Sequence, residues 1–208
     1  MDYQYYSFLV AIVILAYLIG SIPTGYILVK LVKGIDIRQV GSGSIGATNV
    51  KRVLGRWAFI LVMFIDALKG YLPVIAAQNL QFQLDIFPEY NILPIFVAVA
   101  VIVGHSRSIF LGFTGGKSVA SGVGTIFGLS APVGLITVLT WVAVTYITKY
   151  VSVGSIVAVL ATPIWMYVFH KPVSYIVYCL IGGLYIALYL HRENIKRLIA
   201  GNENKIRE

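Results

Sequence analysis

Long apolar stretches without charged side chains are the feature that most limits what this chain can fold into. A helix needs about 20 consecutive apolar residues to cross the hydrocarbon core of a bilayer, and the first such stretch runs from Tyr5 to Val29. Hydrophobic residues make up 59% of the 208 positions and charged residues only 12%, against roughly 45–50% and 25% in soluble domains. A soluble globule could not bury so much apolar surface, so we predict an all-α integral membrane protein.

The first apolar stretch is interpreted as a retained span and not as a signal peptide. No basic residue precedes it, no small-residue cleavage site follows it, and it is longer than the apolar core of a signal sequence. Pro23 lies inside it. Because proline cannot donate the helical hydrogen bond, we expect a kink between Gly20 and Thr24.

The basic segments predict the orientation of the helices. Lysine and arginine gather in residues 30–56 and in the tail from residue 191, whereas residues 78–91 carry Asp85 and Glu89 and no basic side chain. By the positive-inside rule, the two basic segments face the cytoplasm and the acidic one lies outside.

The number of spans depends on the apolar run at residues 119–148. As one helix this run would be about 45 Å long, and it contains Gly128, Pro132 and Gly134 near its middle. Only a split of this run into two helices returns the basic tail to the cytoplasm. We therefore expect seven transmembrane helices, some short or kinked, with the N-terminus outside and the C-terminus cytoplasmic.

We expect one transmembrane domain over residues 1–208 in the cell (inner) membrane. The expected spans are approximately 5–29, 55–77, 92–112, 117–130, 132–149, 152–169 and 173–191. On this topology the polar, glycine-rich stretches all lie on the cytoplasmic side, which predicts a site facing the cytoplasm at the inner leaflet.

The first glycine-rich stretch, GSGSIGATNV, occupies residues 41–50. Its glycines leave the backbone free to turn several N–H groups toward one point, which suits an anion. Asn49 can offer a side-chain amide, and Arg52 a planar guanidinium that matches phosphate. The alternative is a plain flexible loop whose basic residues only orient the protein.

The second stretch, GHSRSIFLGFTGGKS, occupies residues 104–118. It is not a nucleotide-binding P-loop, because Leu111 stands where that motif requires glycine. Gly115 and Gly116 still precede a helix whose first turn we expect to hold Lys117, so phosphate can meet N–H groups and an ammonium together. For His105 a structural hydrogen bond is the favoured role and a catalytic one the alternative.

Three polar positions in the C-terminal half are further candidates. Ser152 can bind phosphate or cap the helix that follows it. If residues 191–198 form a helix, His191 and Asn194 share one face with Leu198, while Arg192 and Lys196 lie on another that suits anionic headgroups. A solvated basic tail is the alternative there.

Asp66 and Lys69 are ionisable residues in the middle of the second expected span. Such residues are costly at that depth and often functional. Their spacing of three residues also allows them to neutralise each other, and we favour a structural ion pair. No histidine lies five residues before an aspartate, which excludes a His-x4-Asp acyltransferase dyad, and no group of His, Cys and carboxylate residues has metal-ligand spacing. We expect no metal and no cofactor.

The sequence resembles the PlsY family, bacterial integral-membrane acyltransferases that acylate glycerol-3-phosphate from acyl-phosphate. The resemblance covers nearly the whole chain and rests on the order and spacing of six stretches. They are GSIPTGYILVK (20–30), GSGSIGATNVKRVLG (41–55), DALKG (66–70), GHSRSIFLGFTGGKSVASG (104–122), YVSVGS (150–155) and HRENIKRLIAGNE (191–203).

The resemblance implies a reaction and a set of site residues. The enzyme would transfer a fatty acyl group to the sn-1 hydroxyl of glycerol-3-phosphate, giving 1-acyl-glycerol-3-phosphate (lysophosphatidate) and inorganic phosphate, the first step of phospholipid synthesis. The implied catalytic residues are His191, Asn194 and Ser42. The implied substrate- and phosphate-binding residues are Gly41, Gly43, Asn49, Arg52, Gly115, Gly116, Lys117 and Ser152. Acyl-phosphate, glycerol-3-phosphate, membrane lipids and the enzyme that makes acyl-phosphate are the implied partners, and nucleic acid is not among them.

Four positions depart from the family pattern. Ser44 stands where the family usually has asparagine, Ser108 where it has proline, Thr114 where it has lysine and Ser118 where it has glycine. Without an ammonium at Thr114 one anion contact should be weaker, and Ser118 should stiffen its turn. A membrane transporter of an organic phosphate is the alternative function, because broken helices and a buried Asp/Lys pair suit one.

Overall fold

The computed structural model describes residues 3–83 and 92–206. Within these ranges the chain is helical, with no strand beyond an isolated bridge between Ser108 and Thr114. This confirms the predicted all-α class. The chain forms two compact units, Met1–Gly128 and Leu129–Glu208, which are described separately below. Asp85 and Glu89, used above to orient the helices, lie outside the described residues.

The first apolar stretch is broken where proline predicts it. Helix α1 (Tyr3–Ser21) ends two residues before α2 (Thr24–Lys33), with Pro23 between them. The break leaves carbonyl groups without helical partners, and side chains from elsewhere in the unit satisfy two of them. Ser108 Oγ donates to Ser21 O at 2.6 Å, and Lys69 Nζ donates to Ile22 O at 3.0 Å.

The described residues of the first unit after α2 form two longer helices, two shorter ones and two single turns. After α2 come the 3-10 turn η1 (Ile37–Gln39), α3 (Ala47–Leu54) and the long α4 (Arg56–Gln83). Then follow α5 (Ile92–Ser106), the 3-10 turn η2 (Ile109–Leu111) and α6 (Val119–Leu129). The expected span 92–112 was too long, because α5 ends at Ser106 and the chain turns back through η2.

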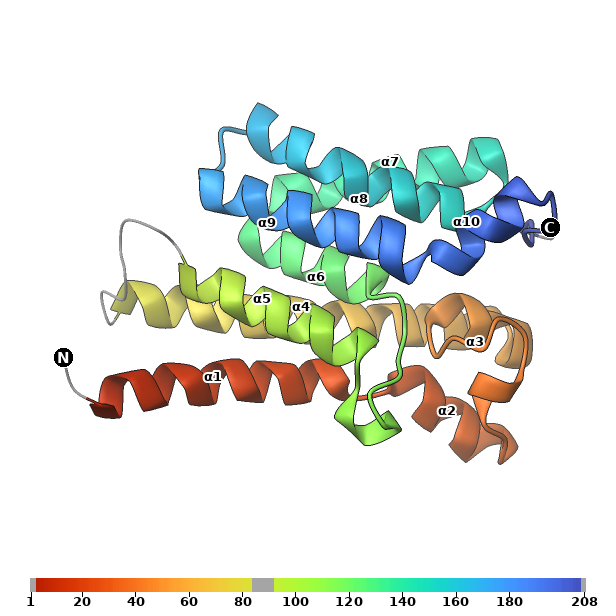
Figure 1. Cartoon of the computed structure of the whole chain (residues 1–208), viewed down its shortest axis with the longest axis horizontal. Helices are drawn as coiled ribbons and strands as arrows, with labels where there is room; N and C mark the ends of the chain where they lie inside the picture. The colour runs from red at the N-terminus through yellow and green to blue at the C-terminus, as the bar shows by residue number, and fades with distance from the viewer. Residues whose placement is uncertain (1–2, 84–91, 207–208) are drawn as a thin grey trace. The chain divides into compact units, whose positions relative to one another are not determined.

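Glycines allow the helices of this unit to approach closely. α1 lies beside α5 (Figure 1), and a Cβ atom at Gly20 or Gly104 would run into the facing helix backbone. Likewise, a Cβ at Gly70 on α4 would meet Ser121 O, and one at Gly124 on α6 would meet Ala67 O. Such small-residue contacts are the usual way in which membrane helices pack.

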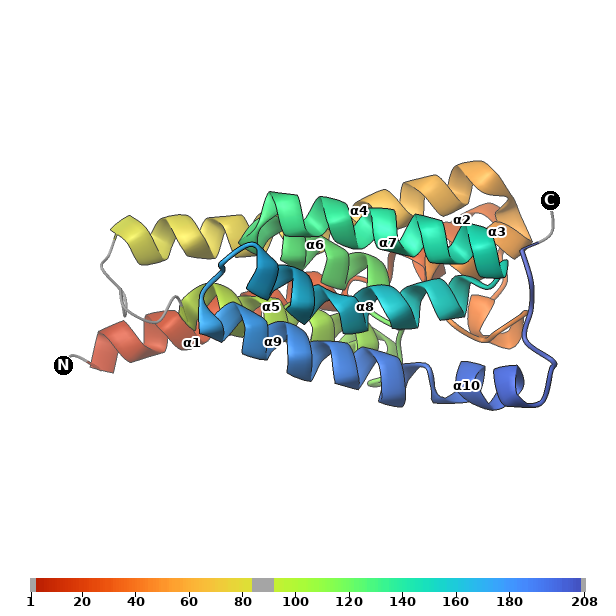
Figure 2. The ribbon, with the colours of Figure 1, turned by 90° about the horizontal axis from the view of Figure 1, so that it is seen from above.

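The second unit is a run of antiparallel helices. α7 (Ala131–Thr148) packs against α8 (Val151–Val168), which packs against α9 (Val173–Leu184), as Figure 2 shows. The π-helical segment η3 (Tyr185–Leu190) continues α9, and α10 (Arg192–Ile199) follows. Residues 119–148 are indeed two helices, since α6 ends at Leu129 and α7 begins at Ala131 with Pro132 in its first turn.

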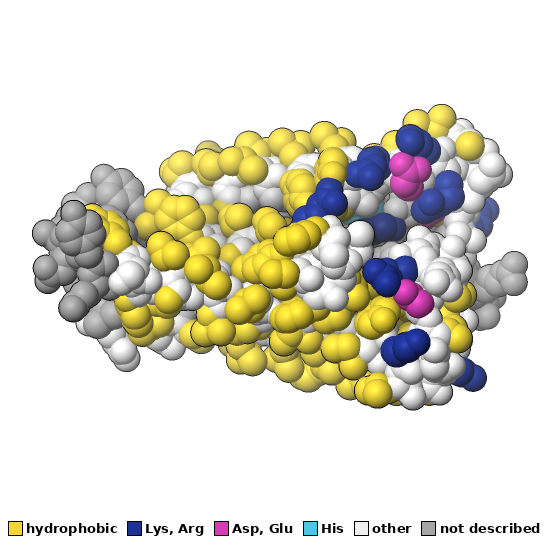
Figure 3. Space-filling view, turned by 60° about the horizontal axis from the view of Figure 1, so that its bottom comes forward, with side chains coloured by type: hydrophobic (Ala, Val, Ile, Leu, Met, Phe, Trp, Pro, Cys, Tyr) yellow, Lys and Arg dark blue, Asp and Glu magenta, His cyan; other side chains and the backbone are white. Residues whose placement is uncertain are grey.

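Five helical stretches in the described residues are long and apolar enough to cross a membrane: Tyr6–Lys33, Arg56–Gln83, Ala131–Thr148, Val151–Val168 and Val173–Leu190. Ile92–Ser106 and Val119–Leu129 are apolar but shorter. On the side of the first unit seen in Figure 3, hydrophobic side chains cover α1, and lysine and arginine gather toward the α2 end. The chain is therefore a multi-pass membrane protein.

Candidate active site

One buried amide organises the first glycine-rich stretch. Asn49, on α3, is 1% exposed. Its Nδ2 donates to Val40 O and Ser44 O, both at 2.9 Å, and to Ile37 O at 3.3 Å, while its Oδ1 accepts the Ser42 N–H at 3.0 Å. The sequence suggested that this amide binds an anion. In the structure its contacts are with the loop backbone, so Asn49 holds the loop in shape.

The side chains left at the surface of this loop are those suited to an anion. Gly41 and Gly43 both have positive φ angles, 63° and 69°, which favour glycine. Ser42 and Arg52 are exposed, and the aliphatic part of Arg52 lies beside Gly41. The loop backbone, a hydroxyl and a guanidinium therefore lie close together.

An ion pair stands just before this loop. Asp36 accepts from the Arg38 guanidinium at 2.7 Å and from the Arg38 backbone N–H at 2.9 Å. These hydrogen bonds hold the pKa of the Asp36 carboxyl below its usual range, and Asp36 in turn raises the pKa of Arg38. This arginine is thus engaged by a local carboxylate, whereas Arg52 forms no ion pair with a carboxylate in residues 3–83 and 92–206.

The second glycine-rich stretch is built against His105. The Gly116 N–H donates to His105 O at 3.0 Å, and the ring edge that carries Nε2 fills the space where a side chain at Gly116 would lie. A Cβ at Gly115 would likewise run into His105 O. Both glycines are thus required by close approach. The hydrogen bond from Gly116 is to the backbone carbonyl of His105, and the ring contacts the loop by packing.

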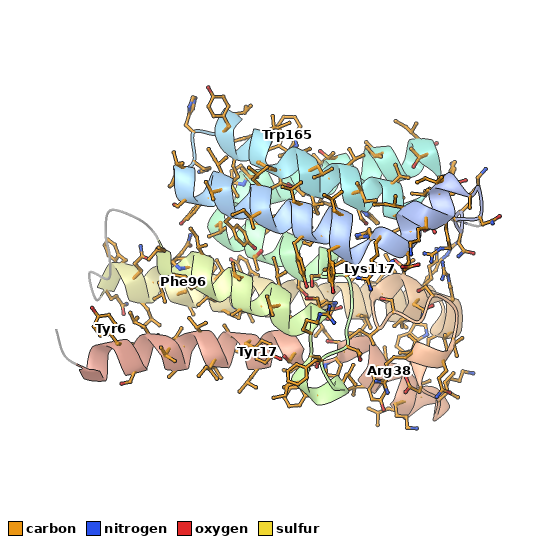
Figure 4. All side chains as sticks on the ribbon, in the orientation of Figure 1. Tyr6, Tyr17, Arg38, Phe96, Lys117 and Trp165 are labelled. Carbon is orange, nitrogen blue, oxygen red and sulfur yellow. The ribbon has the colours of Figure 1, made fainter. Side chains whose placement is uncertain are left out.

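Lys117 precedes the helix and is not part of its first turn, contrary to the expectation for residues 117–130. Lys117, labelled in Figure 4, lies half-buried on the segment that leads into α6. Ser118 has a φ of 56°, a left-handed conformation that no α-helix continues through, so α6 begins at Val119. Glycine, which the PlsY resemblance suggests at this position, would adopt this φ without strain.

The other departures also have local consequences. Ser108 has φ −65° and ψ 124°, angles that proline also adopts. As serine it instead donates from Oγ to Ser21 O and from its N–H to Thr114 O at 3.3 Å. The exposed Thr114 donates its hydroxyl to Leu111 O at 2.8 Å, and Ser44 Oγ accepts the Gly46 N–H at 3.3 Å.

A shared core joins the two glycine-rich stretches. Ile45 and Val50 from the first stretch and Leu111 from the second belong to one buried hydrophobic cluster, with Val29 and Ile37. A Cβ at Gly25, on α2, would run into Ile45 O. Residues 51–103 separate the two stretches in sequence, yet packing brings them into one substructure of the first unit.

Asp66 and Lys69 form the predicted ion pair, with Nζ 2.8 Å from Oδ1. Both side chains are buried, as is His105, whose Nδ1 lies 3.9 Å from the same Asp66 oxygen. Lys69 also donates to Ile22 O at the break between α1 and α2. Three buried titratable groups therefore lie between that break and the second glycine-rich stretch.

In the second unit, His191 is oriented by the π-helical segment. It is 2% exposed, and its Nδ1 lies 2.8 Å from Ile186 O, five residues earlier. A carbonyl oxygen only accepts, so Nδ1 carries the proton and Nε2 is the nitrogen able to take a second one. The expected helix 191–198 begins at Arg192, after a change of direction at His191.

Asn194 is buried, as is His191, while Arg192 and Lys196 are exposed, which agrees with the predicted division of the segment into two faces. Asn194 Nδ2 donates to Glu203 Oε1 at 2.6 Å, and Arg197 Nε donates to Glu203 Oε2 at 2.7 Å. Burial alone would raise the pKa of Glu203, but hydrogen bonds from Asn194 and Arg197 and the nearby Ser152 hydroxyl bring the pKa below its ordinary value.

Ser152 does not cap α8. Tyr150 occupies the cap position, and α8 begins at Val151, so Ser152 lies in the first turn. Its hydroxyl is buried near the Glu203 carboxylate. Glu203, which contacts Asn194 and lies near Ser152, is a residue that the sequence reasoning missed. Gly201, with a φ of 70°, lies in the turn that brings the chain back toward α10. The sequence contains this turn signal, but it does not indicate that Glu203 contacts Asn194 and Arg197.

Among residues 3–83 and 92–206, no group of three His, Cys, Asp or Glu side chains could hold a metal ion. The described site chemistry consists of N–H groups, hydroxyls, amides, guanidinium and ammonium groups, the carboxylates of Asp66 and Glu203, and one buried imidazole in each unit.

The known proteins that this chain resembles share one name, and each match covers most of the chain. The family model described as glycerol-3-phosphate acyltransferase matches residues 10–201. A protein named glycerol-3-phosphate acyltransferase from Trichormus variabilis is 46% identical over 209 residues, covering 94% of this chain and 91% of its own. The protein of the same name from Aquifex aeolicus is 40% identical over 194 residues, covering 93% and 97%.

Two crystal structures of PlsY, an integral membrane glycerol 3-phosphate acyltransferase, have the same fold. Its glycerol 3-phosphate form is 37% identical and superposes with a TM-score of 0.86 over 96% of both chains. Its lysophosphatidic acid form is 36% identical, with a TM-score of 0.84 over 96% of this chain and 95% of the other.

Proposed function

The chain belongs to the glycerol-3-phosphate acyltransferase family, and from this premise we propose that it acylates glycerol-3-phosphate with acyl-phosphate as the donor. The sn-1 hydroxyl oxygen attacks the acyl carbonyl carbon, the bond between that carbon and the phosphate oxygen breaks, and the hydroxyl proton leaves with phosphate. The products are 1-acyl-glycerol-3-phosphate and inorganic phosphate. This reaction starts phospholipid synthesis in the membrane.

The observation that carries the choice of donor is the presence of two glycine-rich stretches on one shared core. The acceptor and the proposed donor both bear phosphate, and each stretch combines close-packed glycines with a cation, Arg52 in one and Lys117 in the other. Fixed N–H groups and cations stabilise charge that develops during transfer. A donor whose acyl carbonyl is not bonded directly to phosphate would place no phosphate beside the reacting carbon for the second stretch to bind.

Roles are assigned residue by residue. Gly41, Gly43, Gly115 and Gly116 shape the loops, Arg52 and Lys117 clamp phosphate, and Asn49 positions the first loop. The residues proposed to be catalytic are those that the resemblance implies, Ser42 in the first unit and His191 and Asn194 in the second, and Ser152 is proposed to offer a hydroxyl to phosphate. The partners are the two substrates, the surrounding lipids and the enzyme that supplies acyl-phosphate.

The base is a substrate phosphate in this proposal. The second pKa of phosphate lies near 6, close enough to working pH for a phosphate to take the hydroxyl proton. His191→Ala tests this assignment. If the pH–rate profile of the variant keeps its acidic limb, where the base becomes protonated, phosphate is the base; loss of that limb would assign the role to His191.

We also propose the topology predicted from the charges: one domain with seven spans, an external N-terminus and a cytoplasmic C-terminus in the inner membrane. The two shorter apolar helices, Ile92–Ser106 and Val119–Leu129, complete the seven. Cysteine introduced at Ser42 or at Lys117 should then react with an impermeant thiol reagent only from the cytoplasmic side. Labelling of these two positions from opposite sides would contradict the topology and the site.

The direct test uses purified protein, labelled glycerol-3-phosphate and either acyl-phosphate or acyl-CoA. We expect labelled lysophosphatidate with acyl-phosphate and little with acyl-CoA. Arg52→Lys should lower activity although it keeps the charge, because a lysine cannot bind phosphate through two N–H groups. The alternative function, transport, predicts counterflow of glycerol-3-phosphate in liposomes without any acyl donor, and that result without lipid product would overturn the proposal.

A further inference from the structure

The Asp66–Lys69–His105 cluster is buried, charged and unused by the proposed reaction. The three side chains are 2%, 6% and 4% exposed. Buried charges are costly in a membrane helix, and an ion pair in the interior contributes little stability over neutral residues of the same volume. Stability alone therefore gives no reason for the chain to keep these groups here.

The contacts of Lys69 lead to the first glycine-rich stretch. Its ammonium bridges Asp66 Oδ1 at 2.8 Å and Ile22 O at 3.0 Å. Ile22 immediately precedes Pro23, and α2 starts at Thr24. Gly25, in the first turn of α2, abuts the Ile45 backbone within the stretch 41–50. The position of this stretch is thus tied to the Lys69 ammonium through one helix turn.

The contacts of His105 lead to the second stretch. Its ring lies 3.9 Å from the Asp66 carboxylate on one side, and its Nε2 edge packs against Gly116 on the other. Its carbonyl holds the Gly116 N–H. Lys117 is the next residue, so a shift of His105 moves the predicted phosphate-binding backbone and its cation together.

We propose that Asp66, Lys69 and His105 are positioning residues for acyl transfer, which fix the two glycine-rich stretches relative to each other by holding Ile22 O on one side and Gly116 on the other. This inference rests on the proposed function. A plain structural ion pair would only stabilise the folded state. The proposed positioning role means that the geometry of both glycine-rich stretches also depends on the cluster.

A neutral double variant separates the two roles. Lys69→Met alone leaves the Asp66 carboxylate buried without its partner and should lower thermal stability. Asp66→Asn/Lys69→Met removes both charges and should regain that stability. A purely structural pair predicts that activity returns as well. The positioning role predicts that KM for glycerol-3-phosphate stays about tenfold or more above wild type, because misplacement of binding groups by even 1 Å is costly.

Gln81→Met is the matched control on the same helix. Gln81 is also buried, at 5% exposed, and its Oε1 accepts the Leu93 N–H at 3.0 Å, at the end of α4 far from the cluster in sequence. This variant loses a buried polar contact too. We expect it to lower the melting temperature while KM for both substrates stays within about twofold of wild type.

His105 variants provide a second readout that leaves the ion pair intact. We expect His105→Leu to raise KM for glycerol-3-phosphate and His105→Gln, which keeps a polar group at the Nε2 position, to recover part of the loss. The inference is wrong if the neutral double variant recovers wild-type KM, or if His105→Leu leaves KM unchanged. If the double variant does not fold, the comparison of KM between His105→Leu and His105→Gln decides whether the cluster has a positioning role.

Binding of glycerol-3-phosphate by titration calorimetry separates this inference from the proposed function. If the wild-type protein shows no transfer from acyl-phosphate, the proposed donor is wrong. If it transfers but the cluster variants bind glycerol-3-phosphate with wild-type affinity, only the positioning role is wrong.

Discussion

Gly116→Ala gives the most direct test of how the second glycine-rich stretch is built. An added Cβ would lie 2.9 Å from His105 Cδ2 and nearer still to Nε2, whereas ordinary contact begins at 3.4 Å. The ring has little room to retreat, because it is 4% exposed and has the Asp66 carboxylate 3.9 Å from its Nδ1. We therefore expect the loop backbone to move by about 1 Å.

A displacement of this size has a predictable effect on rate. Misplacing a reacting or binding group by about 1 Å can lower the rate about 100-fold, or about 2.7 kcal/mol in transition-state stabilisation. The assay is release of inorganic phosphate from acyl-phosphate at varied glycerol-3-phosphate. We expect kcat/KM of Gly116→Ala to fall by about this factor, with the larger part in KM for the phosphate-bearing substrates.

The control for Gly116→Ala is the same substitution at Gly182 on α9. A Cβ there would meet its nearest atom, on Tyr178, at 4.0 Å, so activity should not change. The double variant Gly116→Ala/His105→Ala removes the ring that causes the clash and should recover part of the loss. A Gly116→Ala enzyme with kcat/KM within about threefold of wild type would refute the steric reasoning.

Three further predictions follow from individual contacts. Asn49→Leu should destabilise the protein by about 3 kcal/mol or more, since it leaves loop carbonyls without donors, and limited trypsin digestion should then cut near Arg52. The free energy of unfolding of Ser118→Gly should exceed that of Ser118→Ala by about 0.5–1 kcal/mol, measured by thermal denaturation. Both variants lose the hydrogen bond to Ile102 O, but only glycine adopts the positive φ without strain. Glu203→Gln should weaken the dependence of the melting temperature on pH in the acidic range. The pKa of Glu203 lies below its ordinary 4.5 in the folded protein, so its stabilisation is present above that pH and is lost as pH falls through the lower folded value. Wild type should lose melting temperature more steeply than the variant below about pH 4.5.

Helix breaks with a local cause were predictable from the sequence. Pro23 and Pro132 each lie at a break between two helices, where proline removes a helical hydrogen-bond donor. Pro73 and Pro163 lie inside α4 and α8, so a proline alone does not determine a break. The end of α5 was not predictable in the same way. Ile109, Phe110 and Leu111 are apolar enough to extend a span, but Leu111 instead enters the buried core of the first unit through a 3-10 turn.

The residue types of the site were predictable, but several roles were not. The amide of Asn49 offers the same donors to a phosphate and to a backbone carbonyl, and only the folded loop determines which it meets. Glu203 lies nine residues after Asn194 and contacts it only because of the turn at Gly201. A single sequence contains the turn signal but no information on the side chains that the turn brings together.

The loop held by Asn49 has a thermodynamic consequence for the catalytic cycle. A flexible loop of this length would lose conformational entropy each time a ligand ordered it. Here four hydrogen bonds from one side chain impose that order during folding, before any ligand arrives. If this loop binds phosphate as proposed, product departure need not disorder it, and each new substrate meets the same geometry.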